Sequence, residues 1–332
     1  APLPIQFDLS DGPSLSGLVW HHDQPRHIVL GVHGFNDYSK AFEPLAQHLA
    51  TQLHATVYAY DQRGFGANPQ PGIWAGSDAL LADLRQRYLG LIKRAVTNFT
   101  QLGDDQPFAR FHSAGFYDPK ASEWTIPPLA RPLTLQNVHQ LELIEHQFER
   151  ILAEGVAGDL IEAGVWRGGA IIFMRALLAA HAVTDRQVIA ADSFTGIPLS
   201  EKFRHDEVNK WTDRWEAGLT DVRAAIARFD LLDEQVELLE GFFADTLPGL
   251  ASRELAMIRL DSDSFDSTET SLEYLYPLLN KGGVVIVDDW HLIGCRIAVD
   301  NYRRKHKLAG EVQVTAGNAW WIKHEERGYP AR

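Results

Sequence analysis

The chain has 332 residues and a formal net charge of −13 at pH 7, a length that predicts two structural units or one large α/β domain with an appendage. The negative charge argues against a nucleic-acid partner, because phosphate binding needs clustered Lys and Arg, and the single cysteine, Cys295, excludes an internal disulfide and a cysteine-based zinc site. No apolar run approaches the roughly 20 residues of a membrane span, and the chain does not begin with a signal region. We therefore expect a cytoplasmic protein without a membrane partner. A homo-oligomer is possible.

The first 86 residues predict a small α/β segment. Strands are expected at residues 5–9, 15–20, 27–33 and 56–61, with an amphipathic helix at residues 41–53. The stretches at 29–36 and 57–66 resemble the start of an α/β-hydrolase of the lysophospholipase or monoacylglycerol lipase type. In that family the turn at His33, Gly34 and Phe35 helps to form the oxyanion hole.

A working serine hydrolase also needs a Gly-x-Ser-x-Gly turn, followed by an acid and a histidine. The chain contains no such motif, and the nearest match is Phe111-His-Ser113-Ala-Gly115, with Phe at the first glycine position. A serine esterase or lipase using Ser113 is therefore an alternative function. Our preferred interpretation is that residues 1–86 are a partial α/β-hydrolase-like segment that packs as an accessory layer.

The rest of the chain, residues 87–332, predicts a larger α/β domain. A helical pattern at 78–98 leads into an irregular region at 100–131 and a helix at 137–154. Strands are then expected at 160–163, 188–192, 236–240, 256–261 and 284–289, with helices between them and a closing hairpin at 312–323. Alternating strands and helices predict a mostly parallel sheet covered on both faces, whose ligands bind at the carboxyl ends of the strands.

A glycine-rich turn follows the first of these strands. Its spacing is Glu162-x-Gly164-x-x-x-Gly168, which differs from the Gly-x-Gly-x-x-Gly of pyrophosphate-binding turns. A carboxylate at this place would repel a pyrophosphate but suits the cationic amino-acid end of S-adenosylmethionine. A plain strand-turn-helix without a ligand remains the alternative.

The next two strands also end in residues that suit a nucleoside. Asp192 closes the second strand and is followed by Ser193 and Phe194, and an acid at this point is well placed for ribose hydroxyls. It fits a helix cap or turn equally well. Gly241 and Phe242 follow the third strand, where a glycine beside an aromatic ring lets an adenine lie against the chain. Aromatic side chains that fill the core beneath a turn are the alternative there.

Two pairs of carboxylates follow the last two parallel strands, Asp261 with Asp263 and Asp288 with Asp289. Such pairs repel one another unless a cation lies between them, and Mg²⁺ with its preference for oxygen ligands would resolve the repulsion. The alternative is that Asp263 and Asp289 cap the helices that follow. His291 is a spare candidate for a general base.

Residues 87–332 resemble the macrocin O-methyltransferase family, which methylates sugar or phenol hydroxyls in natural-product biosynthesis. The resemblance lies in residues 88–98, 159–175, 191–198, 240–248, 260–263 and 282–290. It implies a Rossmann-like methyltransferase that binds S-adenosylmethionine and a Mg²⁺ held by Asp261, Asp288 and Asp289. The chain departs from the family pattern at Ser262, where Gly is usual, at Trp290, where Tyr is common, and at Ala163, where Thr is usual.

These expectations define a metal-dependent O-methyltransferase that acts on a small-molecule hydroxyl acceptor. A base must take the proton of the acceptor hydroxyl, and either Asp261 or Asp263 fits that catalytic role. Glu162, Gly164, Asp192, Ser193, Phe194, Gly241 and Phe242 are the expected cofactor-binding residues. A non-catalytic module that only binds S-adenosylmethionine is a further alternative.

Overall fold

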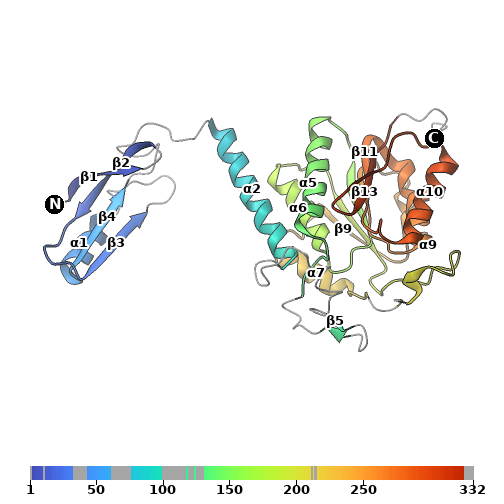
Figure 1. The fold of residues 1–332 in the computed structure, drawn as a ribbon, viewed down its shortest axis with the longest axis horizontal. Helices are drawn as coiled ribbons and strands as arrows, with labels where there is room; N and C mark the ends of the chain where they lie inside the picture. The colour runs from blue at the N-terminus through green and yellow to red at the C-terminus, as the bar shows by residue number, and fades with distance from the viewer. Residues whose placement is uncertain are drawn as a thin grey trace. The chain divides into compact units, whose positions relative to one another are not determined.

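The protein is described by a computed structural model, which covers residues 2–9, 12–32, 43–60, 76–98, 117–118, 123–124, 131–210, 212 and 215–324. The chain divides into two compact units, Ala1–Leu84 and Arg85–Arg332 (Figure 1). The candidate hydrolase residues lie outside the described residues, namely His33, Gly34, Phe35 and Ser113. Most of the irregular region also lies outside them. Within it the structure describes two short paired strands, β5 (Tyr117–Asp118) and β6 (Glu123–Trp124).

The described residues between 2 and 60 form a four-stranded sheet with one helix in the first unit, as predicted. Its strands β1 (Leu3–Leu9), β2 (Gly12–Trp20), β3 (His27–Val32) and β4 (Ala55–Tyr60) lie in the order β1-β2-β4-β3. Only β3 and β4 are parallel, and α1 (Glu43–Gln52) connects them. Ala46 of this helix packs with Trp20 and Val57 in a small separate core.

The second unit contains a seven-stranded sheet. Its strands are β7 (Asp159–Ala163), β8 (Val188–Asp192), β9 (Val236–Glu240), β10 (Leu255–Leu260), β11 (Leu279–Val287), β12 (Gln313–Thr315) and β13 (Asn318–Ile322). They lie in the order β12-β13-β11-β10-β7-β8-β9, and the five strands from β11 to β9 are parallel. The closing hairpin adds β13 antiparallel to β11. The prediction of a mostly parallel sheet is therefore confirmed.

Helices cover both faces of this sheet (Figure 1). One face packs against α2 (Gly76–Val96), α5 (Val138–Ala153), α6 (Gly169–Ala180) and α7 (Leu219–Ala227), and the other against α9 (Phe265–Leu275) and α10 (Ile293–His306). Neighbouring residues of one strand serve opposite cores, as Leu160 and Ile161 of β7 do. This alternation explains why the parallel strands are apolar throughout.

Local sequence explains where several helices begin. Asn137 is the N-cap of α5, and its side chain and that of Gln140 form a reciprocal capping box. Ser264 is the N-cap of α9, with its side chain accepting from the backbone N–H of Ser267.

Short elements follow β9 and α9, namely α8 (Phe243–Thr246), the 3-10 turns η4 (Leu247–Leu250) and η5 (Tyr276–Leu278), while η3 (Glu207–Lys210) follows β8. Among the described residues, no helix has both the length and the apolar character needed to cross a membrane.

Candidate active site

A cavity of about 490 Å³ opens at the carboxyl ends of the parallel strands. Five of the residues predicted to bind a cofactor line it, namely Glu162, Gly164, Asp192, Ser193 and Phe242, and so do Asp261, Asp263, Asp288 and Asp289. The prediction differs from the structure at Phe194 and Gly241, which are not among the lining residues. The side chain of Phe194 is only 4% exposed because it packs into the core.

Gly164 lies where three strand ends meet, and no other residue fits there. Its φ is +96°, and an added Cβ would lie 1.6 Å from the carbonyl oxygen of Asp261. The backbone N–H of Gly164 donates to Ala191 O at 2.9 Å. The glycine therefore lets the ends of β7, β8 and β10 approach one another closely. This close approach brings the acids of the three strands to one cavity.

Asp192 holds the glycine turn in place. Its Oδ2 accepts the backbone N–H groups of Val165 at 2.7 Å and Trp166 at 3.1 Å, and its Oδ1 accepts that of Phe194 at 2.7 Å. Asp192 is thus a turn-stabilising residue, as the alternative interpretation of the sequence had it. An ionised carboxylate offers about four acceptor positions, so capacity for a ligand hydroxyl remains on the same side chain.

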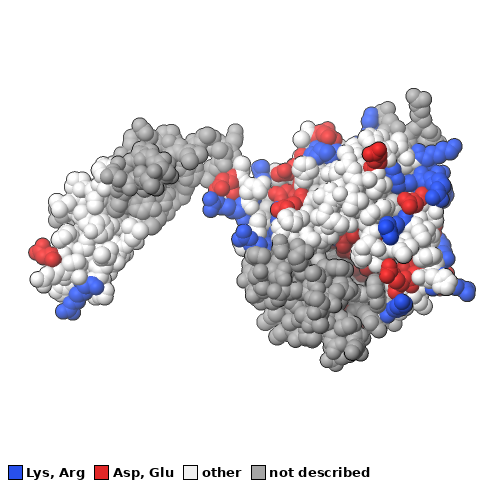
Figure 2. All heavy atoms as spheres, in the orientation of Figure 1, with Lys and Arg blue, Asp and Glu red and all other residues white. Residues whose placement is uncertain are grey.

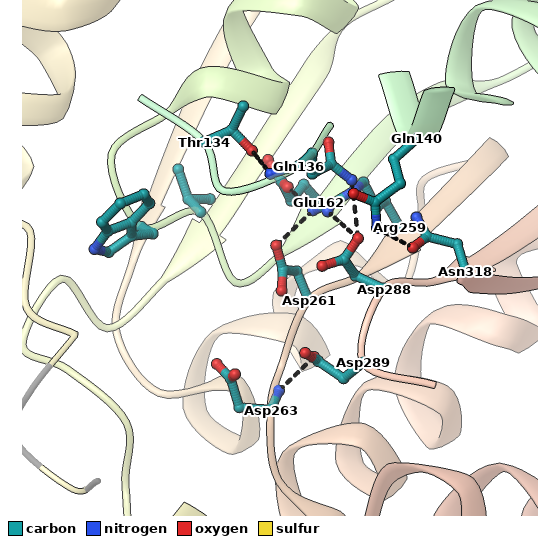
Figure 3. A network of polar contacts seen from close by, with 12 residues as sticks. Thr134, Gln136, Gln140, Glu162, Arg259, Asp261, Asp263, Asp288, Asp289 and Asn318 are labelled. Atoms are coloured by element: carbon teal, nitrogen blue, oxygen red, sulfur yellow. Dashed lines mark hydrogen bonds and ion pairs between the residues drawn. The ribbon is translucent and has the colours of Figure 1, made fainter. Parts of the chain in front are cut away.

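A buried arginine, Arg259, is the centre of the charged network in Figure 3. It is 0% exposed in the middle of the sheet and forms an ion pair with Glu162, its neighbour on β7. Its guanidinium also lies 2.9 Å from Asp261 Oδ2 and 3.0 Å from Asp288 Oδ1. Arginine was not among the predicted site residues, because a single Arg inside an apolar strand carries no motif.

Glu162 keeps one oxygen available. Its Oε1 pairs with Arg259, while Oε2 is buried without a hydrogen-bond partner among the described residues. Burial raises the pKa of Glu162 to about 8, and the nearby Arg259 opposes that rise. An unpartnered buried acceptor is costly, so this oxygen suits a cationic donor such as the amino group of S-adenosylmethionine.

Gln136 reaches the same network from the segment before α5. Its Nε2 donates to Asp288 Oδ1 at 2.9 Å, and its backbone N–H donates to the hydroxyl of Thr134 at 3.2 Å. Gln136 is buried and lines the cavity beside Thr134. Sequence reasoning missed it because 152 residues separate it from Asp288.

The carboxylates of Asp263 and Asp289 lie below this network, and Asp261, which belongs to the network, converges with them (Figure 3). Each offers an oxygen within 4.8 Å of the others. Asp289 Oδ2 also accepts the backbone N–H of Asp263 at 2.8 Å. Burial raises the pKa of Asp261 to about 7 and raises the pKa values of Asp263 and Asp289 well above the usual range for Asp. Oxygen ligands at this spacing fit a hard divalent cation.

The resemblance implied that Asp288 is a metal ligand together with Asp261 and Asp289, but in the structure its carboxylate does not converge with theirs. The structure places Asp263 in the converging group, while Asp288 Oδ1 is engaged by Arg259 and Gln136. Asp288 would reach a cation only through its other oxygen. The alternative that Asp263 and Asp289 cap helices is wrong, because the N-caps of α9 and α10 are Ser264 and Leu292.

The charge balance favours cationic ligands. Arg259 is one positive charge in contact with three carboxylates, those of Glu162, Asp261 and Asp288, and Asp263 and Asp289 lie beyond them. Buried like charges are strongly unfavourable unless they are neutralised. The residues present therefore fit both a cationic cofactor near Glu162 and a divalent cation near Asp261.

Two tryptophans that the prediction missed also line the cavity. Trp166 of the glycine turn and Trp215 have ring centroids 5.9 Å apart in an edge-to-face arrangement. His291, the spare base candidate, lines the cavity as well and is exposed to solvent. Flat apolar rings beside carboxylates suit a ligand that combines an apolar body with hydroxyl groups.

Comparison with known proteins agrees with this geometry. A model of the family "Macrocin-O-methyltransferase (TylF)" matches residues 117–323, and one described as "Serine aminopeptidase, S33" matches residues 23–102. The chain is 39% identical over 249 residues, 73% of its length and 94% of the relative's, to an 8-demethyl-8-(2,3-dimethoxy-alpha-L-rhamnosyl)-tetracenomycin-C 4'-O-methyltransferase of Streptomyces olivaceus.

A mycinamicin III 3''-O-methyltransferase of Micromonospora griseorubida is 36% identical, with 70% of the chain and 95% of the relative covered. The solved structure of the O-methyltransferase NovP matches with a TM-score of 0.62 and 34% identity, over 73% of the chain and 100% of NovP. The N-terminal segment is α/β-hydrolase-like, and the chain belongs to the macrocin O-methyltransferase family.

Proposed function

We propose that the protein transfers a methyl group from S-adenosylmethionine to a hydroxyl of a glycosylated natural product, with help from a divalent cation, Mg²⁺ being the best candidate. One observation carries the proposal. Glu162, whose Oε2 has no hydrogen-bond partner among the described residues, and the converging carboxylates of Asp261, Asp263 and Asp289 line the same cavity. A cofactor-binding end and an acceptor-activating end thus share one space, as methyl transfer in line requires.

The cofactor end is assigned to the glycine turn. Glu162 Oε2 would accept from the amino group of the methionine part, and Asp192 would accept from the ribose hydroxyls. Ser193 and Phe242, which line the cavity near the ends of β8 and β9, would contact the nucleoside. Gly164 contributes by leaving space for the strand ends to meet.

The chemical end is assigned to the four aspartates. Asp261, Asp288 and Asp289 would hold the cation, with Asp288 using Oδ2 because Arg259 and Gln136 fix its Oδ1. Such support behind a ligand is typical of metal sites. The cation would lower the pKa of an acceptor hydroxyl. Asp263 would take the proton, because Arg259 holds the alternative base Asp261.

The acceptor class rests on the relatives and on the walls of the cavity. The relatives' names place methyl groups on a rhamnosyl tetracenomycin, on mycinamicin III and on demethyldecarbamoylnovobiocin. Trp166 and Trp215 offer aromatic surface of the kind that a glycoside or its aromatic aglycone packs against.

The test uses the full chain with S-adenosylmethionine carrying a labelled methyl group. Each of the three compounds named by the relatives is supplied as acceptor, with Mg²⁺ or with EDTA, and products are read by mass spectrometry. We expect one added methyl group on a sugar hydroxyl in Mg²⁺ and none in EDTA. Full transfer in EDTA would remove the cation from the proposal, and tight binding of S-adenosylhomocysteine without any transfer would argue against these acceptors.

A further inference from the structure

The segment after β8 forms a loop, residues 200–209, that a single side chain closes. Asn209 Oδ1 accepts the backbone N–H of Ser200 at 2.7 Å, and Asn209 Nδ2 donates to Ser200 O at 3.1 Å. The Asn209 side-chain amide thereby forms the same two hydrogen bonds with Ser200 that a neighbouring strand's backbone would form. A loop with joined ends and its own packing is a compact, ordered structure of the Ω type.

Asp266, in the first turn of α9, binds one end of this loop. Its carboxylate accepts the Ser200 hydroxyl at 3.1 Å and the backbone N–H groups of Glu201 at 2.8 Å and Lys202 at 3.1 Å. Lys202 also forms an ion pair with Glu269, one turn further along α9, at 2.6 Å. Hydrogen bonds to an ionised carboxylate are about twice as strong as neutral ones, so Asp266 is a strong anchor for the loop.

Asp206 makes the reverse contact, in which the carboxylate belongs to the loop and the N–H donor belongs to α9. Its Oδ2 accepts the backbone N–H of Phe265 at 2.7 Å, and the residue is only 3% exposed. A Cβ added to Gly294 in the first turn of α10 would lie 2.6 Å from the same oxygen. The carboxylate therefore sits against the starts of both helices, where the positive ends of the helix dipoles favour a negative charge. Glycine at 294 leaves the space that it occupies.

Apolar packing supports the two carboxylate anchors. Val208 of the loop is fully buried and packs with Ile197, Leu292 and Cys295, and Trp215 joins this cluster. The rings of Phe203 and Phe265 lie 5.8 Å apart. The loop is thus attached at both ends and in the middle.

The loop and its flanks form one side of the cavity. Ile197, Pro198, Glu207 and Trp215 all line it, beside Asp266 itself. The helices that hold the loop start just after the acids, α9 after Asp263 and α10 after Asp289. The loop therefore takes its position from the backbone that carries the chemical end of the cavity.

We infer that Glu207, together with the flanking Ile197, Pro198 and Trp215, is a preformed wall of the acceptor subsite. Residues 200–209 support this wall, and Asp206 and Asp266 are positioning residues that hold it. The wall sets which acceptors can place a hydroxyl at the aspartates. This inference deepens the proposed function and rests on it for the nature of the acceptor, but the anchoring of the wall can be tested without turnover.

The first experiment measures amide hydrogen exchange of the full chain bound to S-adenosylhomocysteine. The variants are Asp206→Asn, Asp266→Asn and Gly294→Ala, which disturb the same anchors by loss of charge or by added volume. The control is Glu201→Gln, an exposed acid of the same loop. We expect exchange in residues 197–210 to rise about tenfold in the three variants and to stay unchanged in the control, with the exchange of β7 and β8 unaltered. Unchanged exchange in all three variants, or an equal rise throughout the sheet, would overturn the inference.

The second experiment separates positioning from general loss of structure. With the rhamnosyl tetracenomycin acceptor, the variants should raise the KM for the acceptor about tenfold and leave the KM for S-adenosylmethionine and the affinity for S-adenosylhomocysteine unchanged. A fall in kcat with both KM values unchanged would overturn the role in acceptor placement. Lack of turnover by the unaltered protein would count against the proposed acceptor, whereas the exchange experiment would still decide the anchoring.

Discussion

Arg259 lies opposite Glu162 on neighbouring parallel strands, and the two side chains form an ion pair that is almost completely shielded from solvent. Charged groups in the middle of an apolar sheet are expensive unless they are paired. Here the guanidinium also contacts Asp261 and Asp288. The pair therefore connects the proposed cofactor end of the cavity to its chemical end.

Removing Arg259 should be more damaging than removing the pair. Arg259→Met leaves Glu162 buried without its partner, so the free energy of unfolding should fall by about 3–5 kcal/mol. In the double variant Glu162→Gln with Arg259→Met, the loss should be smaller than in Arg259→Met alone, and therefore smaller than the sum of the two single losses. Urea unfolding of all four proteins measures this coupling. Strictly additive losses would show that the two residues stabilise the fold independently.

Asp192→Ala should weaken binding of S-adenosylmethionine at least about tenfold, because it removes both the ribose acceptor and the support of the glycine turn. Asp192→Asn is the matched control, since it keeps one oxygen that can accept from the turn. Calorimetry with the purified protein measures the affinities. An Asp192→Ala variant with unchanged affinity would remove the ribose assignment.

Exchanging single aspartates for asparagine should separate metal ligands from the base. Asp288→Asn and Asp289→Asn should lower the affinity for Mg²⁺ while binding of S-adenosylhomocysteine persists. Asp263→Asn should keep Mg²⁺ binding and lower kcat by about 100-fold or more. Titration calorimetry and steady-state kinetics provide the two readouts. If Asp263→Asn abolished Mg²⁺ binding and Asp288→Asn did not, the converging group of Asp261, Asp263 and Asp289 would be the ligand set.

The stability of the ion-free protein should fall as the pH rises from about 4 to about 8. Burial raises the pKa of Asp261 from 3.8 to about 7 and that of Glu162 from 4.5 to about 8. Within this window the folded protein binds more protons than the unfolded chain, so stability decreases with rising pH. Mg²⁺ binds deprotonated carboxylates, so its effect on Tm should be larger near about pH 8 than near about pH 6. A larger gain at the lower pH would contradict this linkage.

The α/β-hydrolase-like segment should be dispensable for chemistry. Among the described residues, those that line the cavity lie between 133 and 292, whereas the first unit ends at Leu84. A chain of residues 76–332 keeps α2 whole, and with it the buried Leu89, Ile92 and Val96. It should retain methyl transfer, whereas a chain of residues 97–332 should lose stability along with those contacts. Loss of transfer by a 76–332 chain that still binds S-adenosylhomocysteine would assign the first unit a role in the acceptor site.

The strands and helices could be predicted from local sequence patterns, because the spacing of apolar residues indicates which faces of an element are buried. Apolar runs such as Leu255–Leu260 predict strands buried on both faces, and Glu162 with Gly164 predicts a turn that approaches a ligand. The carboxylates of Asp261, Asp263, Asp288 and Asp289 could be placed at one edge of the sheet, since parallel strands end on the same side.

Only the tertiary structure decided which of these side chains meet. Asp263 instead of Asp288 converges with Asp261 and Asp289, because Arg259 and Gln136 hold Asp288 from the other side. The anchors of the acceptor wall likewise join Asp206 to Phe265 across 59 residues. Such contacts depend on which strands and helices become neighbours and on the direction of each side chain. Local sequence patterns contain neither the pairing of distant elements nor the direction of each side chain. The cavity, its charge balance and its wall are therefore determined by the tertiary structure.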